Sequence, residues 1–340
     1  MAHFNICFYE RAIRRERVFK DRSNPLEVLS EKELLEKLRF PRHAIQELAI
    51  DLEEHLRPET LRNFSISPLL QVCLALRFFA TGCFINTAAD LIGVHKSTAS
   101  RIIHRVACAL SGRLPLYPTD VSTLNKVKAD FFNIAGFPNV VGAIDGTHIR
   151  IQAPSTHEPL FVNRKGYHSI NVQAICDAKL RVLNCVARWP GSTHDSRILV
   201  NSRIHDAFER GELQGVLLGD SGYPLKPWLL TPFLNPVSVP QARYNTAHTK
   251  TRNVIERCFG VLKRRFHCLH AELKMKPEKV CNIICACVVL HNMANLPMKC
   301  WSLILTGPLL CTTAILRSKS RTQTGSSPFG ELYTMLTSNM

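Results

Sequence analysis

The run Val140-Val141-Gly142-Ala143-Ile144-Asp145-Gly146-Thr147-His148-Ile149-Arg150-Ile151 decides how the rest of the chain is interpreted. Apolar residues and glycine fill its first five positions, and β-branched residues return at Ile149 and Ile151. This composition predicts a strand over residues 140–152 that contains Asp145. Asp-Gly between apolar runs is also a frequent hairpin turn. The neighbouring residues include no other turn former, which favours a continuous strand.

The segments that follow predict a mixed α/β core around this strand. Residues 166–176 and 180–187 predict two more strands, joined by a tight turn at residues 177–179. A helix over residues 195–210, a strand over 215–219 and a helix beginning near residue 252 come next. No internal repeat is evident in this order of elements.

The part of the chain before this core has a helical pattern. Residues 86–110 predict two short helices joined by a turn at Gly93, the second with Ile102, Val106 and Leu110 on its inner face. Thr87 and Asp90 have the spacing of a capping box. Two such helices are what a helix-turn-helix needs to read the major groove of DNA, and an ordinary helical hairpin has the same pattern.

These patterns divide the chain into five segments. They are a charged N-terminal segment (1–40), a helical, helix-turn-helix-like domain (41–112), a connector with one helix over 126–134 (113–139), the α/β core (140–296) and a tail (297–340). The apolar part of the tail is interrupted by Gly307 and Pro308 and is too short to span a bilayer, so no membrane segment is expected. Its basic, low-complexity continuation predicts disorder.

The charge of the chain favours a polyanionic partner such as nucleic acid. Lysine and arginine outnumber aspartate and glutamate by 43 to 27, which gives a net charge of +16. Charge alone does not separate DNA from RNA. The 13 cysteines are an odd number, and no signal peptide is recognisable at the N-terminus, so a reducing compartment, cytoplasm or nucleus, is expected.

Four acidic residues lie at the ends or in the middle of predicted elements: Asp145, Asp195, Asp220 and Glu256. Three of them have ordinary explanations: a helix N-terminal acid at Asp195, a loop cap at Asp220 and an i,i−4 ion pair between Glu256 and Arg252. Carboxylates from a central strand, its neighbour and a packing helix could also hold two magnesium-like ions, which activate water and stabilise the leaving alkoxide in phosphodiester hydrolysis.

At these acids the sequence resembles the Harbinger transposase-derived nuclease family, relatives of the PIF/Harbinger transposases among the DDE endonucleases. The resemblance covers roughly residues 41–293. The matching runs are Ala143 to Ile149, Val162 to Ser169, Trp189 to Ser196, Leu218 to Pro224, Val254 to Phe266 and Val289 to Asn292. Each run alone is common, and their order along the chain is what makes the resemblance specific.

The resemblance implies an RNase H-like core in which the second catalytic aspartate follows the fourth strand. It therefore assigns Asp145, Asp220 and Glu256 as catalytic acids and metal ligands, with Asp195 as a further metal ligand, in a site for Mg²⁺ or Mn²⁺. The implied activity is metal-dependent endonuclease cleavage of DNA in the nucleus, with the cytoplasm as an alternative location. A Myb-like DNA-binding partner protein is also implied, although the apolar tail departs from the family's polar, acidic one.

Eight basic residues are candidate DNA contacts. They are Lys96, Arg101 and Arg105 on the second helix of the pair, Arg164 and Lys165 in the second matching run, and Lys263, Arg264 and Arg265 after Glu256. Residues 241–276 include nine lysines and arginines and only two acidic residues. A cluster of positive charge of this kind would bind phosphates. For Arg164 and Lys165 a solvated loop is the alternative.

Two smaller clusters have alternative interpretations. Cys281, Cys285, Cys287 and His291 could bind zinc or could simply pack in an apolar helix. His148 and His194 flank the acids and could transfer protons or make structural hydrogen bonds.

Three functions remain open from the sequence: a DNA endonuclease, a domesticated DNA-binding or protein-interaction factor that keeps the acids without turnover, and an RNA-directed hydrolase on the same core.

Overall fold

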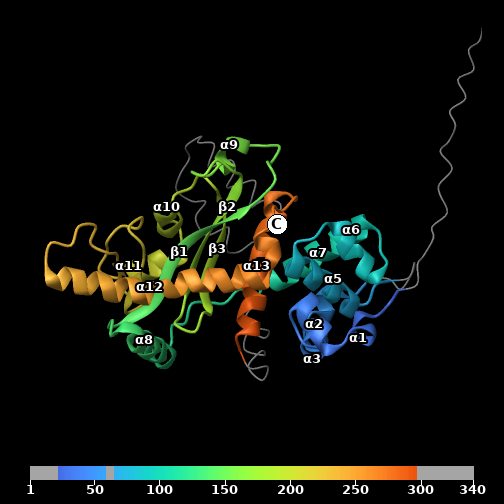
Figure 1. The fold of residues 1–340 in the computed structure, drawn as a ribbon, viewed down its shortest axis with the longest axis horizontal. Coiled ribbons are helices and arrows are strands. Elements are labelled where there is room, and N and C mark those ends of the chain that lie inside the picture. Colours follow the sequence, from blue (N-terminus) through green and yellow to red (C-terminus); the bar gives the residue numbers. More distant parts are fainter. Residues whose placement is uncertain (1–21, 59–64, 297–340) are drawn as a thin grey trace, which may run out of the picture.

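The computed structural model describes residues 22–58 and 65–296, which form a group of helices beside a sheet with its own helices (Figure 1). The elements before the sheet are α1 (Pro25–Val28), α2 (Glu31–Leu38), α3 (Arg42–Asp51), α4 (Glu53–Leu56), α5 (Pro68–Thr81), α6 (Ile85–Ala89), η1 (Asp90–Ile92), α7 (Lys96–Ser111) and α8 (Val121–Ala135). The strands are β1 (Val140–Arg150), β2 (Ser169–Cys176), β3 (Val182–Pro190), β4 (Val216–Leu218) and β5 (Leu229–Leu230). The remaining helices are α9 (Glu158–Phe161), α10 (Asp195–Val200), α11 (Arg203–Glu209), α12 (Val239–Arg265), η2 (His267–Leu269) and α13 (Pro277–Ala294).

The described strands form one mixed sheet in the order β3-β2-β1-β4-β5. β1, β2 and β3 are antiparallel neighbours, whereas β4 and β5 run parallel to β1. β1 continues without a break through Asp145, which lies opposite Ala174 of β2. The hairpin alternative for Asp145-Gly146 is therefore wrong. The pairing of β1 with β4 ends at Ala143 and Leu218, so the two strands separate just before Asp145.

Side chains of β1 alternate between two apolar layers. Ile144 packs in the layer that contains Leu199 of α10 and Phe208 of α11. Ala143 packs in the layer that contains residues of α12 and α13. Asp145 shares the face of Ala143 and therefore points towards α12, while position 146 faces α10.

The helix α12 crosses the sheet and begins earlier than its sequence predicts (Figure 1). It starts at Val239, not near residue 252, because the Ser238 hydroxyl accepts a hydrogen bond from the Gln241 amide at 3.4 Å and Pro240 lies in the first turn. Proline is tolerated there because the first amides of a helix have no intrahelical partner. At the other end, Lys263, Arg264 and Arg265 occupy the last turn, where cations are favoured by the helix dipole.

The helical group includes part of the predicted N-terminal segment. In α2 the Ser30 hydroxyl and the Glu33 carboxylate form a capping box, and Leu34 and Leu38 are buried with Phe40 in the main core. Residues 25–40 thus pack with residues 41–112, because a short amphipathic helix supplies two inward leucines. The expected boundary at residue 40 falls inside a packed unit.

The first helix of the predicted pair corresponds to α6 and η1, and the second corresponds to α7. Gly93, with a backbone in the left-handed region (φ 64°), forms the turn between them. The residue before α6 is Phe84, and no side chain caps this helix. The capping box expected at Thr87 and Asp90 is therefore wrong, because both residues lie after the helix start. The inner face of α7 packs against α5 and α13.

Other bounds differ from the expected ones for local reasons. The connector helix α8 begins at Val121, five residues early, because the Asp120 side chain caps it. The expected helix over 195–210 is two helices, α10 and α11, since Ser202 caps the second one. The two-residue β5 was too short to predict.

The run Val289 to Asn292 connects α13 to the start of β3 through side-chain hydrogen bonds. Asn292 is buried, and its amide accepts from the Val182 N–H at 2.8 Å and donates to the Val182 carbonyl at 2.7 Å. The ring of His291 donates through Nε2 to the Leu180 carbonyl and accepts from Arg265 through Nδ1. Both ring nitrogens of His291 thus serve the fold, and Cys281, Cys285 and Cys287 are buried in α13, which argues for core packing over the zinc alternative.

Three segments lie outside the described residues: 1–21, 59–64 and 297–340. The expectation of a disordered tail, and most of the charged N-terminal segment, fall there. In the part of the chain that the structure describes, no helix combines the length and the apolar character that crossing a membrane requires.

We expect Asn292→Ala to lower the free energy of unfolding by about 2–4 kcal/mol, because it leaves both backbone groups of Val182 unpaired and each buried unpaired group costs about 1–3 kcal/mol. Urea denaturation would measure the change. Asn253→Ala, at an exposed position of α12, is the control and should change stability little. Equal effects of the two substitutions would contradict this role of Asn292.

Candidate functional site

Asp145 is the centre of the candidate site, at the point where β1 and β4 separate. Its side chain is 17% exposed, and its Oδ1 accepts a hydrogen bond from the Gly146 amide at 2.8 Å. Asp220 follows β4 directly after Gly219, and its Oδ1 accepts from the Gly222 amide at 3.0 Å. Because β4 runs parallel to β1, both carboxylates come to the same end of the sheet.

The carboxylates of Asp145, Asp195 and Asp220 are close enough to repel one another. Burial, with a smaller contribution from the charges of Asp220 and Asp195, raises the pKa of Asp145 to about 6, and the Gly146 amide and Arg252 oppose the increase. Burial, together with the charges of the same three acids, also raises the pKa of Tyr223. Three acids that are far apart along the chain are thus near enough for Asp195 and Asp220 to act electrostatically on Asp145.

Asp195 approaches β1 from the opposite side to α12. It is the first residue of α10, as its helix-terminal explanation expected, and His194 caps that helix. A Cβ atom on Gly146 would lie 2.3 Å from the Asp195 Oδ1. Glycine is therefore required at position 146 by the close approach of this carboxylate and not by a turn.

Two buried amides of β2 hold Asp195, and sequence reasoning missed both. Asn171 donates through Nδ2 to the Asp195 Oδ1 at 2.7 Å and to the Thr193 carbonyl at 2.8 Å. Gln173 donates through Nε2 to the Asp195 carbonyl at 3.0 Å and to the Tyr223 hydroxyl at 2.9 Å. The signal was present in the sequence: polar residues alternate with apolar ones in a strand whose every residue is buried.

Glu256 reaches Asp145 only through an arginine. Arg252 donates from Nη1 to the Asp145 Oδ2 at 3.1 Å, and its Nη2 forms a short contact with the Glu256 Oε1. The i,i−4 ion pair expected as the ordinary explanation of Glu256 is thus present, and it extends to β1. Within residues 22–58 and 65–296, no three His, Cys, Asp or Glu side chains are placed so that they could share one metal ion.

Three of the predicted basic residues lie around His148, three residues after Asp145 on β1. Lys263 donates from Nζ to the Thr147 Oγ1 at 2.7 Å and to the His148 carbonyl at 3.1 Å. Burial lowers the pKa of Lys263 to about 8, and the charge of Lys165 contributes. The exposed Arg164 and Lys165 are near enough to lower the pKa of His148, after burial, which is its main cause.

The other predicted basic residues have different surroundings. Arg264 is exposed at the end of α12. Lys96, Arg101 and Arg105 are exposed on α7, which packs against α4, α5, α6 and α13 and not against the acidic site. Arg265 is a correction: its guanidinium donates to His291 and to the Asn295 Oδ1 at 3.1 Å, and so it holds the end of α13. A count of charged residues in the sequence could not distinguish this structural arginine from Lys263 and Arg264 beside it.

The two histidines near the acids make structural hydrogen bonds. His148 Nδ1 lies 3.0 Å from the Ser169 hydroxyl, which also accepts a hydrogen bond from Asn163. His194 accepts from the Ser196 amide at 3.3 Å through Nδ1, which leaves Nε2 to carry the proton when the ring is neutral. Its ring and the Asp220 carboxylate both lie within 4 Å of the position of a Cβ on Gly222.

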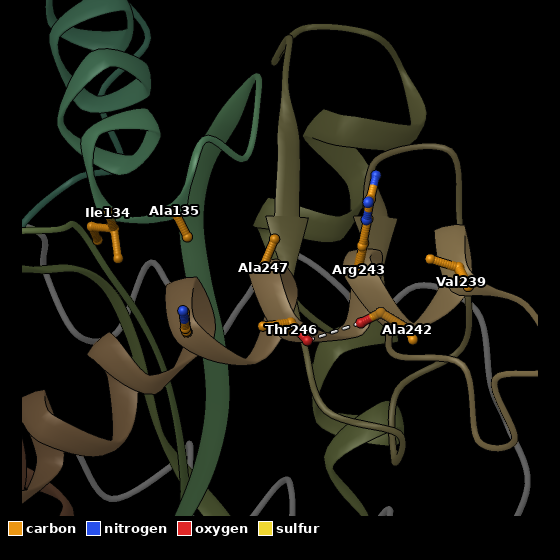
Figure 2. Close-up of a pocket in the computed structure, with 8 residues that line it drawn as sticks. Ile134, Ala135, Val239, Ala242, Arg243, Thr246 and Ala247 are labelled. Atoms are coloured by element: carbon orange, nitrogen blue, oxygen red, sulfur yellow. Dashed lines mark hydrogen bonds between the residues drawn. The ribbon is translucent and has the colours of Figure 1, made fainter.

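A groove of about 420 Å³ lies elsewhere, between the end of α8 and the first half of α12 (Figure 2). Its lining residues are Ile134, Ala135, Val239, Ala242, Arg243, Thr246, Ala247 and Lys250. None of them is acidic, so this groove is not the candidate catalytic site.

Comparison with known proteins identifies the family. Residues 144–292 match the family model described as "DDE superfamily endonuclease". The human protein named "Putative nuclease HARBI1" is 37% identical over 292 residues, which cover 84% of each chain. Its Xenopus laevis counterpart is 38% identical over 262 residues, 75% of this chain and 76% of the relative. The chain belongs to the Harbinger transposase-derived nuclease family.

The plant "Protein ALP1-like" of Arabidopsis thaliana is a more distant relative of this Harbinger-derived chain, 32% identical over 242 residues that cover 66% of this chain and 59% of the relative. The region matched to the DDE superfamily contains all four acids. No solved structure is significantly similar to the chain.

We expect Gly146→Ala and Asp195→Ala to be strongly coupled. The new methyl group would displace the Asp195 carboxylate and break its bond to Asn171, at a cost typical of overpacking, about 1–3 kcal/mol. In an Asp195→Ala background the same substitution should cost much less, since the methyl group meets no carboxylate. Urea denaturation of the four proteins measures the coupling, and additive effects would contradict the close approach.

Asp145→Asn should stabilise the fold at neutral pH. Because the pKa of Asp145 is raised from 3.8 to about 6, the folded protein holds this proton more tightly than the unfolded chain, and the wild type loses stability as pH rises between these values. Asparagine does not titrate. The variant should gain up to about 3 kcal/mol above pH 6, since one pKa unit corresponds to about 1.4 kcal/mol, and nothing below about pH 4. Thermal unfolding of both proteins across this pH range measures the difference in stability. A difference that does not change with pH would contradict the prediction.

Proposed function

We propose that this protein is a divalent-metal-dependent DNA endonuclease that uses Asp145, Asp220 and Glu256 as catalytic acids and Asp195 as a further metal ligand. The observation that carries the proposal is that the charges of Asp195 and Asp220 act on Asp145 where β1 and β4 separate, while Arg252 joins Asp145 to Glu256 on α12. Structural acids have no reason to gather there, because like charges in a half-buried place destabilise the fold.

We further propose that the core is RNase H-like. Support comes from the mixed sheet and from Asp220, which directly follows the fourth strand, where that fold has its second catalytic aspartate. The match of residues 144–292 to the DDE superfamily supports the same assignment.

The residues present fit a hard divalent cation such as Mg²⁺ or Mn²⁺. All four candidate ligands are carboxylates, and oxygen ligands are what these ions prefer. Burial is the main cause of the raised pKa of Asp145, the charges of Asp220 and Asp195 add to it, and a bound cation would oppose both effects. When bound, the metal would supply the charge that polarises water and stabilises the leaving oxygen.

The chain's own residues would prepare the reaction around that centre. Asn171 and Gln173 fix Asp195 through hydrogen bonds, so its carboxylate keeps one orientation. Lys263, with Arg164 and Lys165 nearby, would bind phosphates beside the acids. We propose that Arg264 extends this surface, and that α6 and α7 form a helix-turn-helix with Lys96, Arg101 and Arg105 facing DNA.

A domesticated DNA-binding factor without turnover is the second candidate. The observation that favours it is the pairing of Arg252 with Asp145 and Glu256, which satisfies both acids without a metal. We propose, on the family resemblance, a nuclear location and a Myb-like partner protein for either candidate.

Replacing any one of the three proposed catalytic acids by its amide should reduce Mn²⁺-dependent cleavage of DNA by about a hundredfold to a thousandfold, the range that the loss of one electrostatic group of a catalytic site costs. The variants are Asp145→Asn, Asp220→Asn and Glu256→Gln. Cleavage of a labelled duplex measures the loss, and Glu54→Gln, exposed on α4, is the matched control.

The same assay separates the alternatives. DNA binding by the wild type without cleavage would favour the DNA-binding factor. Protection of the DNA by competing RNA, together with cleavage of that RNA, would favour an RNA-directed hydrolase. Full activity in all three variants would refute the assignment of the acids.

A further inference from the structure

One guanidinium lies between two of the proposed metal ligands. Nη1 of Arg252 bonds to the Asp145 Oδ2 at 3.1 Å, while Nη2 contacts the Glu256 Oε1. The two terminal nitrogens therefore serve carboxylates on different elements, β1 and α12. The side chains of Arg252 and Asp145 are each 17% exposed, so solvent screens this contact only partly.

Arg252 occupies the space between two of the acids. A cation that bound the Asp145 Oδ2 and the Glu256 Oε1 would lie beside the positive guanidinium and would compete with it for these oxygens. Arginine stays charged at any physiological pH, so it cannot leave by losing its proton. Metal and guanidinium must therefore compete for the two carboxylates.

Arg252 also contributes to the stability of the metal-free fold. Asp145 lies among Asp195 and Asp220, both of which raise its pKa, and Arg252 is the cation whose charge opposes them. Without that charge the acids would repel one another in a half-buried place. The packing of Val254, Ile255 and Cys258 fixes α12 on the sheet, so the helix need not move when the side chain does.

From this geometry we infer that Arg252 is an exchangeable counter-ion: it holds Asp145 and Glu256 in the metal-free protein and gives up both carboxylates when a divalent cation binds. The inference rests on the proposed function, because it takes these acids as metal ligands. It assigns Arg252 as a positioning residue and predicts that the wild type binds metal more weakly than its carboxylates alone would allow.

The test is calorimetric titration of the full chain with Mn²⁺, together with thermal unfolding in the absence of metal. Arg252→Gln removes the competing cation, so we expect Mn²⁺ to bind about tenfold or more tightly, as one ion pair in a site of intermediate dielectric can account for. The metal-free variant should melt at a lower temperature than the wild type, and saturating Mn²⁺ should remove most of that difference.

Two further variants make the result specific. Arg257→Gln removes one exposed charge five residues further along α12 and should change Mn²⁺ affinity by less than about threefold, because solvent screens its charge. Arg252→Lys keeps the charge but cannot contact both carboxylates with a planar pair of nitrogens. We expect it to fold even if Arg252→Gln does not, and to bind Mn²⁺ more tightly than the wild type by a smaller factor.

The outcomes distinguish this inference from the proposed function. Asp145→Asn should abolish Mn²⁺ binding; if it does, and the Arg252 variants bind no more tightly than the wild type, the counter-ion role is overturned and the metal site stands. If Mn²⁺ binds none of the proteins at millimolar concentration, both proposals fail. Equal tightening in Arg257→Gln would show a general charge effect and would also overturn the role of Arg252.

Discussion

The concentration of negative charge at the point where β1 and β4 separate is the constraint on which the rest of the structure depends. Asp145, Asp195 and Asp220 come from a strand, a helix start and a strand end, and the charges of Asp195 and Asp220 increase the cost of ionising Asp145. Such a cluster is stable only if the surrounding fold fixes the groups and supplies compensating interactions. The Gly146 amide, Arg252 and the amides of β2 are those interactions.

The helices on the two faces of the sheet supply different groups of the candidate site. On one face, α10 delivers Asp195 so closely that only glycine fits beneath it at position 146. On the other face, α12 brings Arg252, Glu256 and Lys263 along one side of a single helix. The end of this helix is tied down by Arg265, which bonds to α13 and whose carbonyl accepts from Arg39. The arginine that pairs with the acids and the arginine that holds α13 thus lie on the same helix.

The sequence predicted the central features because they depend on local patterns. Apolar runs around Asp145 predicted β1, and the matching motifs located the acids and the family. Other features depend on partners distant in the chain. Pro240 concealed the start of α12, since proline often lies outside helices, and Arg265 resembled Lys263 and Arg264 until its contacts with α13 were known. The alternation of Asn171 and Gln173 within β2 was readable, but only the fold shows that both amides meet Asp195.

The length of α12 has a mechanical consequence. Its 27 residues form a rod roughly 40 Å long at about 1.5 Å per residue, anchored at the Arg265 end and lining an open groove at the Val239 end. A tilt of about 5° around the anchored end would shift Glu256 by roughly 1 Å and Val239 by roughly 3 Å. Misplacement of a catalytic group by about 1 Å can change a reaction rate a hundredfold. A molecule that bound in the groove and tilted α12 would therefore affect the site by displacing Glu256, without contacting the acids.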